Sequence, residues 1–318
     1  MPRILLIKTS SLGDVVHNLP VLADIAAARP DVTIDWVVEE AFAAIPRLHP
    51  RVSQVLPVAM RRWRRALWNP AVWGEVRMFI STLRTQSYEA AIDTQGLFKS
   101  AWIASVTRGV SHGLDWQSSR EPLGLFYGHR HHVPWGQHAV ERNRQLAAQA
   151  LGYTVAAPAQ YGITAATQDF SWLDPSRPHA VLLHATSADR KLWPEERWIE
   201  LGKTLAAQGI SSVLPWGTAA EHERSLRLAQ QIAQAVVPER LELSLLAALL
   251  AQARVVVGTD TGLTHLAGAL GVPTVGIYCA TDPAATGLHA CARGVNLGGI
   301  DAAPSAVQVI AAVDGLLR

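Results

Sequence analysis

Several features that mark other protein classes are scarce or absent in this 318-residue sequence. Its only cysteines, Cys279 and Cys291, are too few for a disulfide scaffold or a thiolate metal cage, and a reducing compartment fits them. No stretch approaches the roughly 18 uninterrupted apolar residues of a membrane span. Only four apolar residues separate Pro2-Arg3 from Lys8, so we expect no signal peptide and a cytosolic chain. The formal net charge of +2 does not favour general nucleic-acid binding.

Two nucleotide-binding signatures are also missing. The segment TSSLGD (9–14) lacks the G-x-G-x-x-G of a dinucleotide site, and G-x-x-x-x-G-K-[ST] occurs nowhere in the chain. These absences argue against a dehydrogenase and against a P-loop ATPase.

Short apolar runs alternate with helical patterns along most of the chain. Strands are predicted at 3–8, 33–40, 54–58, 90–96, 180–185, 211–217, near 236, 254–260 and 274–280, and helices at about 15–29, from 97, 137–151, from 195, from 219, 244–251, from 261 and 304–317. This alternation predicts α/β architecture with parallel sheets and helices on both faces. A segment rich in Ala, Pro, Thr and Ser interrupts it, so we predict two doubly wound domains, 1–157 and 179–318, joined by a linker at 158–178. The last helix could pack in its own domain or back on the N-terminal one.

In such sheets ligands bind beyond the carboxyl ends of the strands, which here are followed by the turns 9–14, 93–96, 186–193, 216–218 and 259–262. The clearest motif is GTDTGLTHLAGALGVPTVGIY (258–278), in which Asp260 or Thr261 caps a helix and Gly262 lies in its first turn. The unpaired amides and the dipole of a helix start suit a phosphate, and His265 lies one turn after Thr261. The alternative is a capped helix with His265 in the core.

Two further turns carry polar groups at strand ends. In HATSADRKLWPEERW (184–198), Thr186 and Ser187 supply hydroxyls and Lys191 a mobile positive charge, which suits a pyrophosphate; an ordinary surface loop would look similar. In LPWGTAAEHERS (214–225), Glu221 could accept hydrogen bonds from ribose hydroxyls, or it could be an acidic residue favoured by the helix dipole.

Two clusters and one lone carboxylate complete the candidates. Arg61, Arg62, Arg64 and Arg65 fall within five positions with no acid until Glu75, which favours anion binding over a solvated face. His129, His131, His132 and His138 lack an acidic or cysteine partner in sequence, so we predict no metal site there. Asp14 lies in the turn between the first strand and the next helix, and it could be a helix cap or a base directed at a ligand.

Taken together, these stretches resemble a known family. The segments are KTSSLGDVVHNLP, DWVVEEAFAAIP, RRWRRALW, DTQGLFKSA, SREPL, HAVERNR, HATSADRKLWPEERW, LPWG and DTGLTHLAGAL, nearly end to end and in order. They resemble the lipopolysaccharide heptosyltransferases of glycosyltransferase family 9, in particular heptosyltransferase I, which moves heptose from ADP-heptose to Kdo₂-lipid A. The resemblance implies a GT-B architecture with the active site between two Rossmann-like domains, and an inverting transferase without a cofactor or metal.

The resemblance also implies roles for individual residues. Asp14 would be the catalytic base, and Lys191 would stabilise the departing ADP. The donor site would comprise Thr186, Ser187, Lys191, Glu221, Leu241, Asp260, Thr261, Gly262 and His265. The acceptor side would comprise Lys8, Arg61, Arg62, Arg64, Arg65, Lys99 and Arg120. Because the acceptor is a lipid, the enzyme would visit the anionic cytoplasmic face of the inner membrane of a Gram-negative bacterium.

The alternatives differ in what they require of the sequence. The transferase that adds the second heptose shares the D-T-G-x-x-H motif, and DWVVEE and RRWRR favour the first-heptose enzyme. A non-catalytic nucleotide-sugar-binding protein would keep Lys191 and residues 260–265 without needing Asp14, and a membrane adaptor would need the arginines alone.

Overall fold

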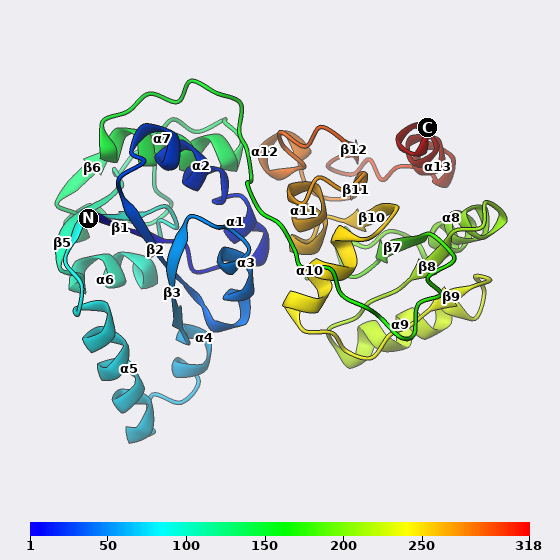
Figure 1. Cartoon of the computed structure of the whole chain (residues 1–318), viewed down its shortest axis with the longest axis horizontal. Helices are drawn as coiled ribbons and strands as arrows, with labels where there is room; N and C mark the ends of the chain where they lie inside the picture. Colours follow the sequence, from blue (N-terminus) through cyan, green and yellow to red (C-terminus); the bar gives the residue numbers. More distant parts are fainter. The chain divides into compact units, whose positions relative to one another are not determined.

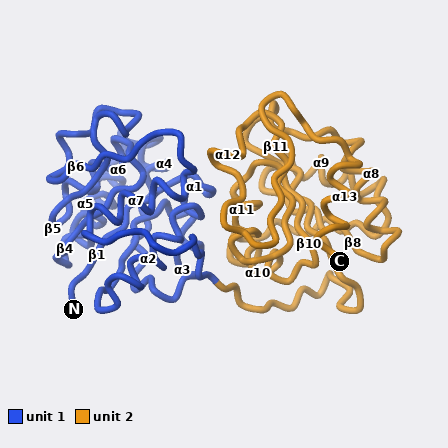
Figure 2. The backbone as a smooth tube through the Cα atoms, turned by 90° about the horizontal axis from the view of Figure 1, so that it is seen from above, with its two compact units in different colours: residues 1–163 blue, residues 164–318 orange.

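A computed structural model describes all residues from 1 to 318, which form two compact units, 1–163 and 164–318 (Figure 2). The division falls within the predicted linker, and the residues on its two sides attach to different units. Gly162 approaches the ring of His49 in the first unit, whereas the Gln168 carbonyl accepts a hydrogen bond from Gln252 in the second. No helix has both the length and the apolar character needed to cross a membrane.

The first unit is a six-stranded sheet with helices on both faces. Its strands are β1 (Arg3–Ile7), β2 (Thr33–Glu39), β3 (Val52–Val58), β4 (Tyr88–Asp93), β5 (Gly109–Leu114) and β6 (His129–His131). Its helices are α1 (Leu12–Val16), α2 (Pro20–Ala28), η1 (Glu40–Phe42), α3 (Ala44–Arg47), α4 (Met60–Trp63), α5 (Pro70–Leu83), α6 (Phe98–Val106), η2 (Gly124–Phe126) and α7 (Ala139–Leu151).

The strand order β3-β2-β1-β4-β5-β6 is parallel throughout. The chain builds outward from β1 through β2 and β3, then returns to the other side of β1 and continues from β4. The order therefore reverses between β1 and β4, and the crevice at such a point is where ligands bind in open α/β sheets.

Alternating side chains of the strands lie on the two faces of this sheet. Leu5 and Ile7 join a buried cluster with Phe79 and Leu83 of α5 and Ile103 of α6, and α2 and α7 lie together on the opposite face (Figure 1). The predicted helix at 15–29 is in fact two helices. Pro20 opens α2, where its missing N–H is tolerated, so the helical run breaks before it.

The second unit repeats the plan. Its strands are β7 (His179–Leu183), β8 (Ser211–Val213), β9 (Ala235–Val236), β10 (Val255–Thr259), β11 (Thr274–Tyr278) and β12 (Gly294–Gly298). Its helices are η3 (Asp189–Lys191), α8 (Glu195–Ala207), α9 (Ala219–Ala229), α10 (Leu243–Ala251), α11 (Gly262–Ala269), α12 (Pro283–Thr286) and α13 (Ala306–Leu317). The order β12-β11-β10-β7-β8-β9 places the reversal between β7 and β10.

The last helix, α13, packs on α8 and on β10, β11 and β12 of its own unit. Val309 and Val313 bury its apolar face, and the Pro304 carbonyl just before it accepts hydrogen bonds from Trp193 and Arg197.

Strands β5, β6 and β12 were not predicted, because they are edge or near-edge strands without a continuous apolar run. Their sequences GVSHGL, HRH and GVNLG are rich in glycine and polar residues and largely lack the burial that made the central strands recognisable.

Candidate functional site

In the second unit, hydroxyl groups tie the ends of β7 and β10 together at the strand-order reversal. The Thr259 hydroxyl donates to the Ala185 carbonyl at 3.1 Å, and the Thr186 hydroxyl donates to the Asp260 carbonyl at 3.1 Å. The loops after these two strands are therefore fixed relative to one another, and both carry predicted donor-site residues.

Asp260 is the centre of this arrangement. Its Oδ2 accepts from Lys191 Nζ at 2.7 Å and from the Thr281 hydroxyl at 2.8 Å, and its Oδ1 lies 3.4 Å from His265 Nε2. Burial alone would raise the pKa of this carboxyl, but the bonds from His265, Lys191 and Thr281 outweigh it and hold the pKa well below the ordinary value. Asp260 is thus a fixed negative charge that positions the Lys191 ammonium.

Helix α11 starts directly after this carboxylate. Thr261 is its extended N-cap and makes no side-chain capping bond, so the amides of Gly262 and Leu263 point outward unpaired. Gly258 permits the close approach of strand and helix, because a Cβ there would lie 2.1 Å from Thr264 Oγ1. The Lys191 ammonium beside a helix start is a suitable environment for a diphosphate.

The remaining donor candidates lie on neighbouring loops. Glu221 forms a capping box at the start of α9, where its Oε2 accepts from the Gly217 amide at 2.7 Å and from the Thr218 amide at 3.2 Å. Oε2 of Glu221 therefore caps the helix, and Oε1 is available to a ligand. Ser187 is exposed, and Leu241 is partly buried in the loop before α10.

In the first unit, the turn after β1 is held by side chains from other elements. Lys8 is only 6 % exposed and donates to the Thr94 carbonyl at 2.7 Å and to Asn143 Oδ1 at 3.3 Å. Burial lowers its pKa, an effect that Asp14 and Asp93 oppose. Lys8 therefore supports this turn from beneath.

Asp14 caps a helix with only one of its two carboxylate oxygens. Its Oδ2 accepts from the Ser11 amide at 2.7 Å and from the Ser11 hydroxyl at 2.8 Å, which completes a capping box for α1. Its Oδ1 makes no hydrogen bond within the protein, and the side chain is only partly buried. One carboxylate can thus cap the helix with one oxygen and offer the other to a ligand.

The predicted acceptor residues also lie beyond the carboxyl ends of strands in this unit. Lys99 donates to the Ser10 hydroxyl, and burial lowers its pKa, while Glu39 and Asp14 oppose that shift and Arg61 and Arg64 add to it. Arg120 lies close enough to help lower the pKa of Lys8. Lys99 therefore contacts the turn that carries Asp14, with Arg61 and Arg64 near Lys99 and Arg120 near Lys8.

The arginine cluster divides into different roles. Arg62 pairs with Glu40 at 3.2 Å and with Glu75 at 2.8 Å, so its charge is already neutralised, whereas Arg64 and Arg65 are exposed and have no carboxylate partner. The absence of neighbouring acids in the sequence was misleading, because these two come from other elements.

Three of the histidines lie close together. His112 Nδ1 and His131 Nε2 share a hydrogen bond at 3.0 Å with their ring centroids 5.3 Å apart, and the His129 ring stacks on His112 at 5.1 Å. No group of three potential ligands in the chain has metal-binding geometry. Burial and the two neighbouring histidines lower the pKa of His112 to about 4. His132 pairs with Asp115 at 3.0 Å, and His138 caps α7.

Comparison with known proteins identifies the family. The model of glycosyltransferase family 9, described as heptosyltransferase, matches residues 76–309. The chain belongs to glycosyltransferase family 9. This family 9 chain is 48 % identical over 299 residues to lipopolysaccharide heptosyltransferase 1 of Pseudomonas aeruginosa, covering 93 % of this chain and 83 % of the relative. It is 48 % identical over 291 residues to the Escherichia coli K12 protein of the same name, covering 90 % of each.

A solved structure shows the same architecture. E. coli heptosyltransferase WaaC with ADP aligns with a TM-score of 0.91 at 41 % identity over 99 % of both chains. WaaC has also been solved with ADP-2-deoxy-2-fluoro heptose, and that structure aligns with a TM-score of 0.84. The two parallel six-stranded sheets of this family 9 protein are those of the GT-B fold.

Sequence reasoning missed two residues that shape these sites. Thr281 donates to Asp260 from the loop after β11, and the Gln95 side chain accepts hydrogen bonds from the Thr9 and Ser10 amides at 3.1 and 3.0 Å. Both directly follow a strand adjacent to one that carries a predicted site, and this position was the signal that could have revealed them.

Proposed function

We propose that this chain is the first-heptose transferase of the lipopolysaccharide inner core. It moves L-glycero-D-manno-heptose from ADP-heptose to a Kdo hydroxyl of Kdo₂-lipid A. The observation that carries this choice is the difference between two groups of relatives. Identity is 48 % with heptosyltransferase 1 of E. coli K12 but 26 % with heptosyltransferase 2 of the same strain.

The donor diphosphate binds to the second unit. Lys191, held by Asp260, and the outward amides of Gly262 and Leu263 supply positive potential for the phosphates, with Thr186, Ser187, Thr261 and His265 beside them. Glu221 accepts from ribose hydroxyls with its uncommitted oxygen, and Leu241 provides apolar contact for adenine.

Asp14 is the base of the transfer. Its Oδ1 takes the proton from the attacking Kdo hydroxyl as the new bond forms at the anomeric carbon of heptose. The bond from that carbon to the diphosphate oxygen breaks on the opposite face, which inverts the configuration. ADP keeps the electron pair, and Lys191 and the first-turn amides of α11 stabilise the growing charge. No divalent ion takes part in this proposed mechanism.

Kdo₂-lipid A also explains the basic groups of the first unit. Arg61, Arg64, Arg65, Lys99 and Arg120 meet the Kdo carboxylates and lipid A phosphates, and Lys8 supports the turn that presents Asp14. Arg62 contributes by holding its two acidic partners in place. The protein works as a peripheral enzyme on the cytoplasmic face of the inner membrane.

The test is a comparison of acceptors. Purified protein is given ADP-heptose with either Kdo₂-lipid A or heptosyl-Kdo₂-lipid A, and ADP release and the mass of the product are measured. Transfer to Kdo₂-lipid A alone supports the proposal. Transfer only to the heptosylated acceptor would make the protein the second-heptose enzyme, and tight ADP-heptose binding without turnover would make it a binding protein.

A further inference from the structure

One face of α5 exposes large apolar side chains that the proposed transfer reaction does not require. Along this helix and the loop before it, Trp68 is 82 % exposed, Trp73 50 % and Met78 70 %. The apolar side of the same helix is already buried through Val72, Phe79 and Leu83, so these large side chains are additional to what the core needs. Such concentrated exposure of large apolar side chains marks an interaction surface.

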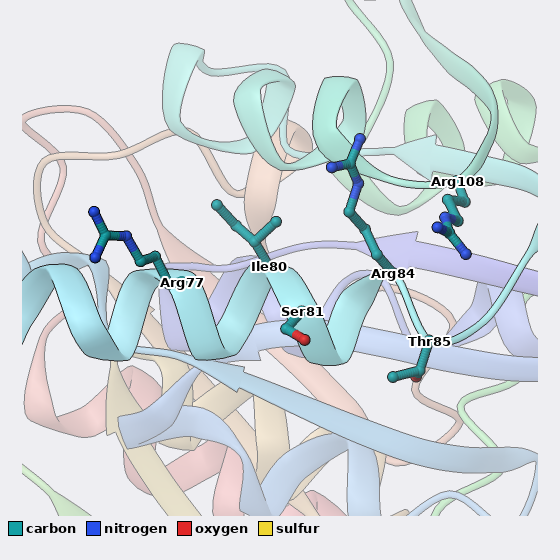
Figure 3. A pocket seen from close by; sticks show the side chains of 6 residues that line it. All are labelled: Arg77, Ile80, Ser81, Arg84, Thr85 and Arg108. Carbon is teal, nitrogen blue, oxygen red and sulfur yellow. The ribbon is translucent and has the colours of Figure 1, made fainter.

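A basic pocket adjoins these apolar side chains. Arg77, Arg84 and Arg108 line a cavity of about 470 Å³ together with Ser81 and Thr85, with Arg84 and Arg108 toward one end and Arg77 toward the other (Figure 3). None of the three guanidinium groups has a carboxylate partner, and no acid lines the pocket. Like charges this dense are stabilised by an anion.

The pocket lies away from the proposed catalytic groups. Arg84 and Arg108 precede β4 and β5, and the Tyr88 amide donates to the Arg108 carbonyl at 2.8 Å where these strands begin. Asp14, Lys99 and Arg64 follow the opposite, carboxyl ends of the strands. A Kdo sugar bound near Asp14 therefore does not account for the pocket.

Apolar and basic groups form one continuous strip. Trp73 and Arg77 are one helical turn apart on the same side of α5, and Trp73 Nε1 donates to the Leu67 carbonyl at 2.9 Å, which fixes the loop that carries Trp68. The only acid between residues 59 and 85 is Glu75, and it is engaged by Arg62 and by Trp63 Nε1. The strip therefore has a strong and unopposed positive charge.

We propose that this α5 face, formed by Trp68, Trp73, Arg77, Met78, Arg84 and Arg108, docks the protein on an anionic bilayer, with a lipid headgroup phosphate in the arginine pocket. Tryptophan and methionine beside arginines match an interface of acyl chains and anionic headgroups. A site for a free phosphate would not need the exposed apolar side chains next to it. The inference rests on the proposed function, because it explains how an enzyme without a spanning helix works on a lipid acceptor.

The test compares two triple variants with the same change in charge. Each of three arginine-to-glutamate changes alters the charge by two, so both variants go from the formal +2 to −4. The first carries Arg77→Glu, Arg84→Glu and Arg108→Glu. The control carries Arg47→Glu, Arg130→Glu and Arg318→Glu, which are exposed arginines outside the α5 face.

Binding is measured by co-sedimentation with phosphatidylcholine vesicles that contain or lack phosphatidylglycerol. At about 1 kcal/mol for each basic residue at the surface, loss of the three pocket arginines weakens binding to the anionic vesicles at least about 100-fold, and the control weakens it much less. Trp68→Ser weakens it about tenfold, with thermal unfolding unchanged. Equal loss in both triple variants would overturn the proposal, since it would show a general charge effect.

Two further measurements separate this inference from the proposed function and from a free-phosphate site. Transfer to an acyl-free Kdo acceptor is expected to be unchanged in the first triple variant, while transfer to vesicle-embedded Kdo₂-lipid A falls. Loss of both would place the pocket in the acceptor site and refute docking. Inorganic phosphate is not expected to bind calorimetrically at micromolar concentration, and such binding, with vesicle affinity unchanged in the variant, would also refute it.

Discussion

The two oxygens of Asp14 allow its proposed catalytic role to be separated from its structural one. Oδ2 closes the capping box with Ser11, and Oδ1 has no partner in the protein. The amide oxygen of the Asp14→Asn variant can still accept hydrogen bonds from Ser11, but the amide cannot act as a base. Asp14→Ala removes both functions.

The two variants should therefore differ in stability and agree in activity. Loss of a general base lowers kcat by about 10²–10⁴, or about 3–5 kcal/mol in the barrier, in both. Loss of the cap costs about 1 kcal/mol of unfolding free energy, and only Asp14→Ala should show it. ADP affinity should be unchanged in both, because the proposed donor site lies in the second unit.

A matched control exists in the last helix. Gln308 accepts from the Ser305 amide at 2.8 Å and from its hydroxyl at 3.2 Å, which is the same box built with a neutral amide. This geometry shows that an amide oxygen is sufficient for the cap. Gln308→Ala should cost the same ~1 kcal/mol and leave transfer unchanged.

The assays are steady-state ADP release with Kdo₂-lipid A, calorimetric ADP binding and urea unfolding. Full transfer by Asp14→Asn would refute the assignment of Asp14 as the base. The assignment would also be refuted if the transfer rate fell only in Asp14→Ala and the decrease matched the fraction of protein that is unfolded.

Three other predictions concern different parts of the molecule. Lys191→Met should lower kcat about 10²–10³-fold and destabilise the fold by about 3 kcal/mol, because Asp260 loses its lysine partner and keeps only His265 and Thr281. Adding Asp260→Asn should restore unfolding stability in urea but not ADP release. Burial lowers the pKa of His184 from 6.5 to about 4, so the unfolded chain takes up a proton first as the pH falls. The contribution of His184 to stability is then complete above pH 6.5 and falls by about 2 kcal/mol at pH 5. The pKa values of His49 and His112 are lowered to about 4 as well, so His184→Gln should reduce the slope of stability against pH in urea titrations without removing it, and an unchanged slope would exclude a contribution from His184. Arg64→Ala should raise the acceptor KM while Arg62→Ala, already neutralised and exposed, changes it little; equal effects in initial-rate assays would contradict this division.

Most of the central architecture could be predicted from sequence. Buried parallel strands are apolar runs, as in Ile4–Ile7 and Val255–Val257, and the turns after them are short and polar, so both the strands and the turns beyond their carboxyl ends could be located. The edge strands β6 and β12 could not be predicted, because only neighbouring hydrogen bonds and not their own residues make them strands.

The sequence by itself determined the alternation of strand and helix, the two-unit plan and the residues offered at each strand end, because these depend on local patterns of apolar and turn-forming residues. Tertiary structure decided which charges are neutralised and which remain for a ligand. Arg62 and Arg64 are indistinguishable in the sequence, yet only Arg62 meets Glu40 and Glu75, which are 22 and 13 positions away. Ion pairs between distant segments depend on three-dimensional proximity, which spacing along the chain does not encode.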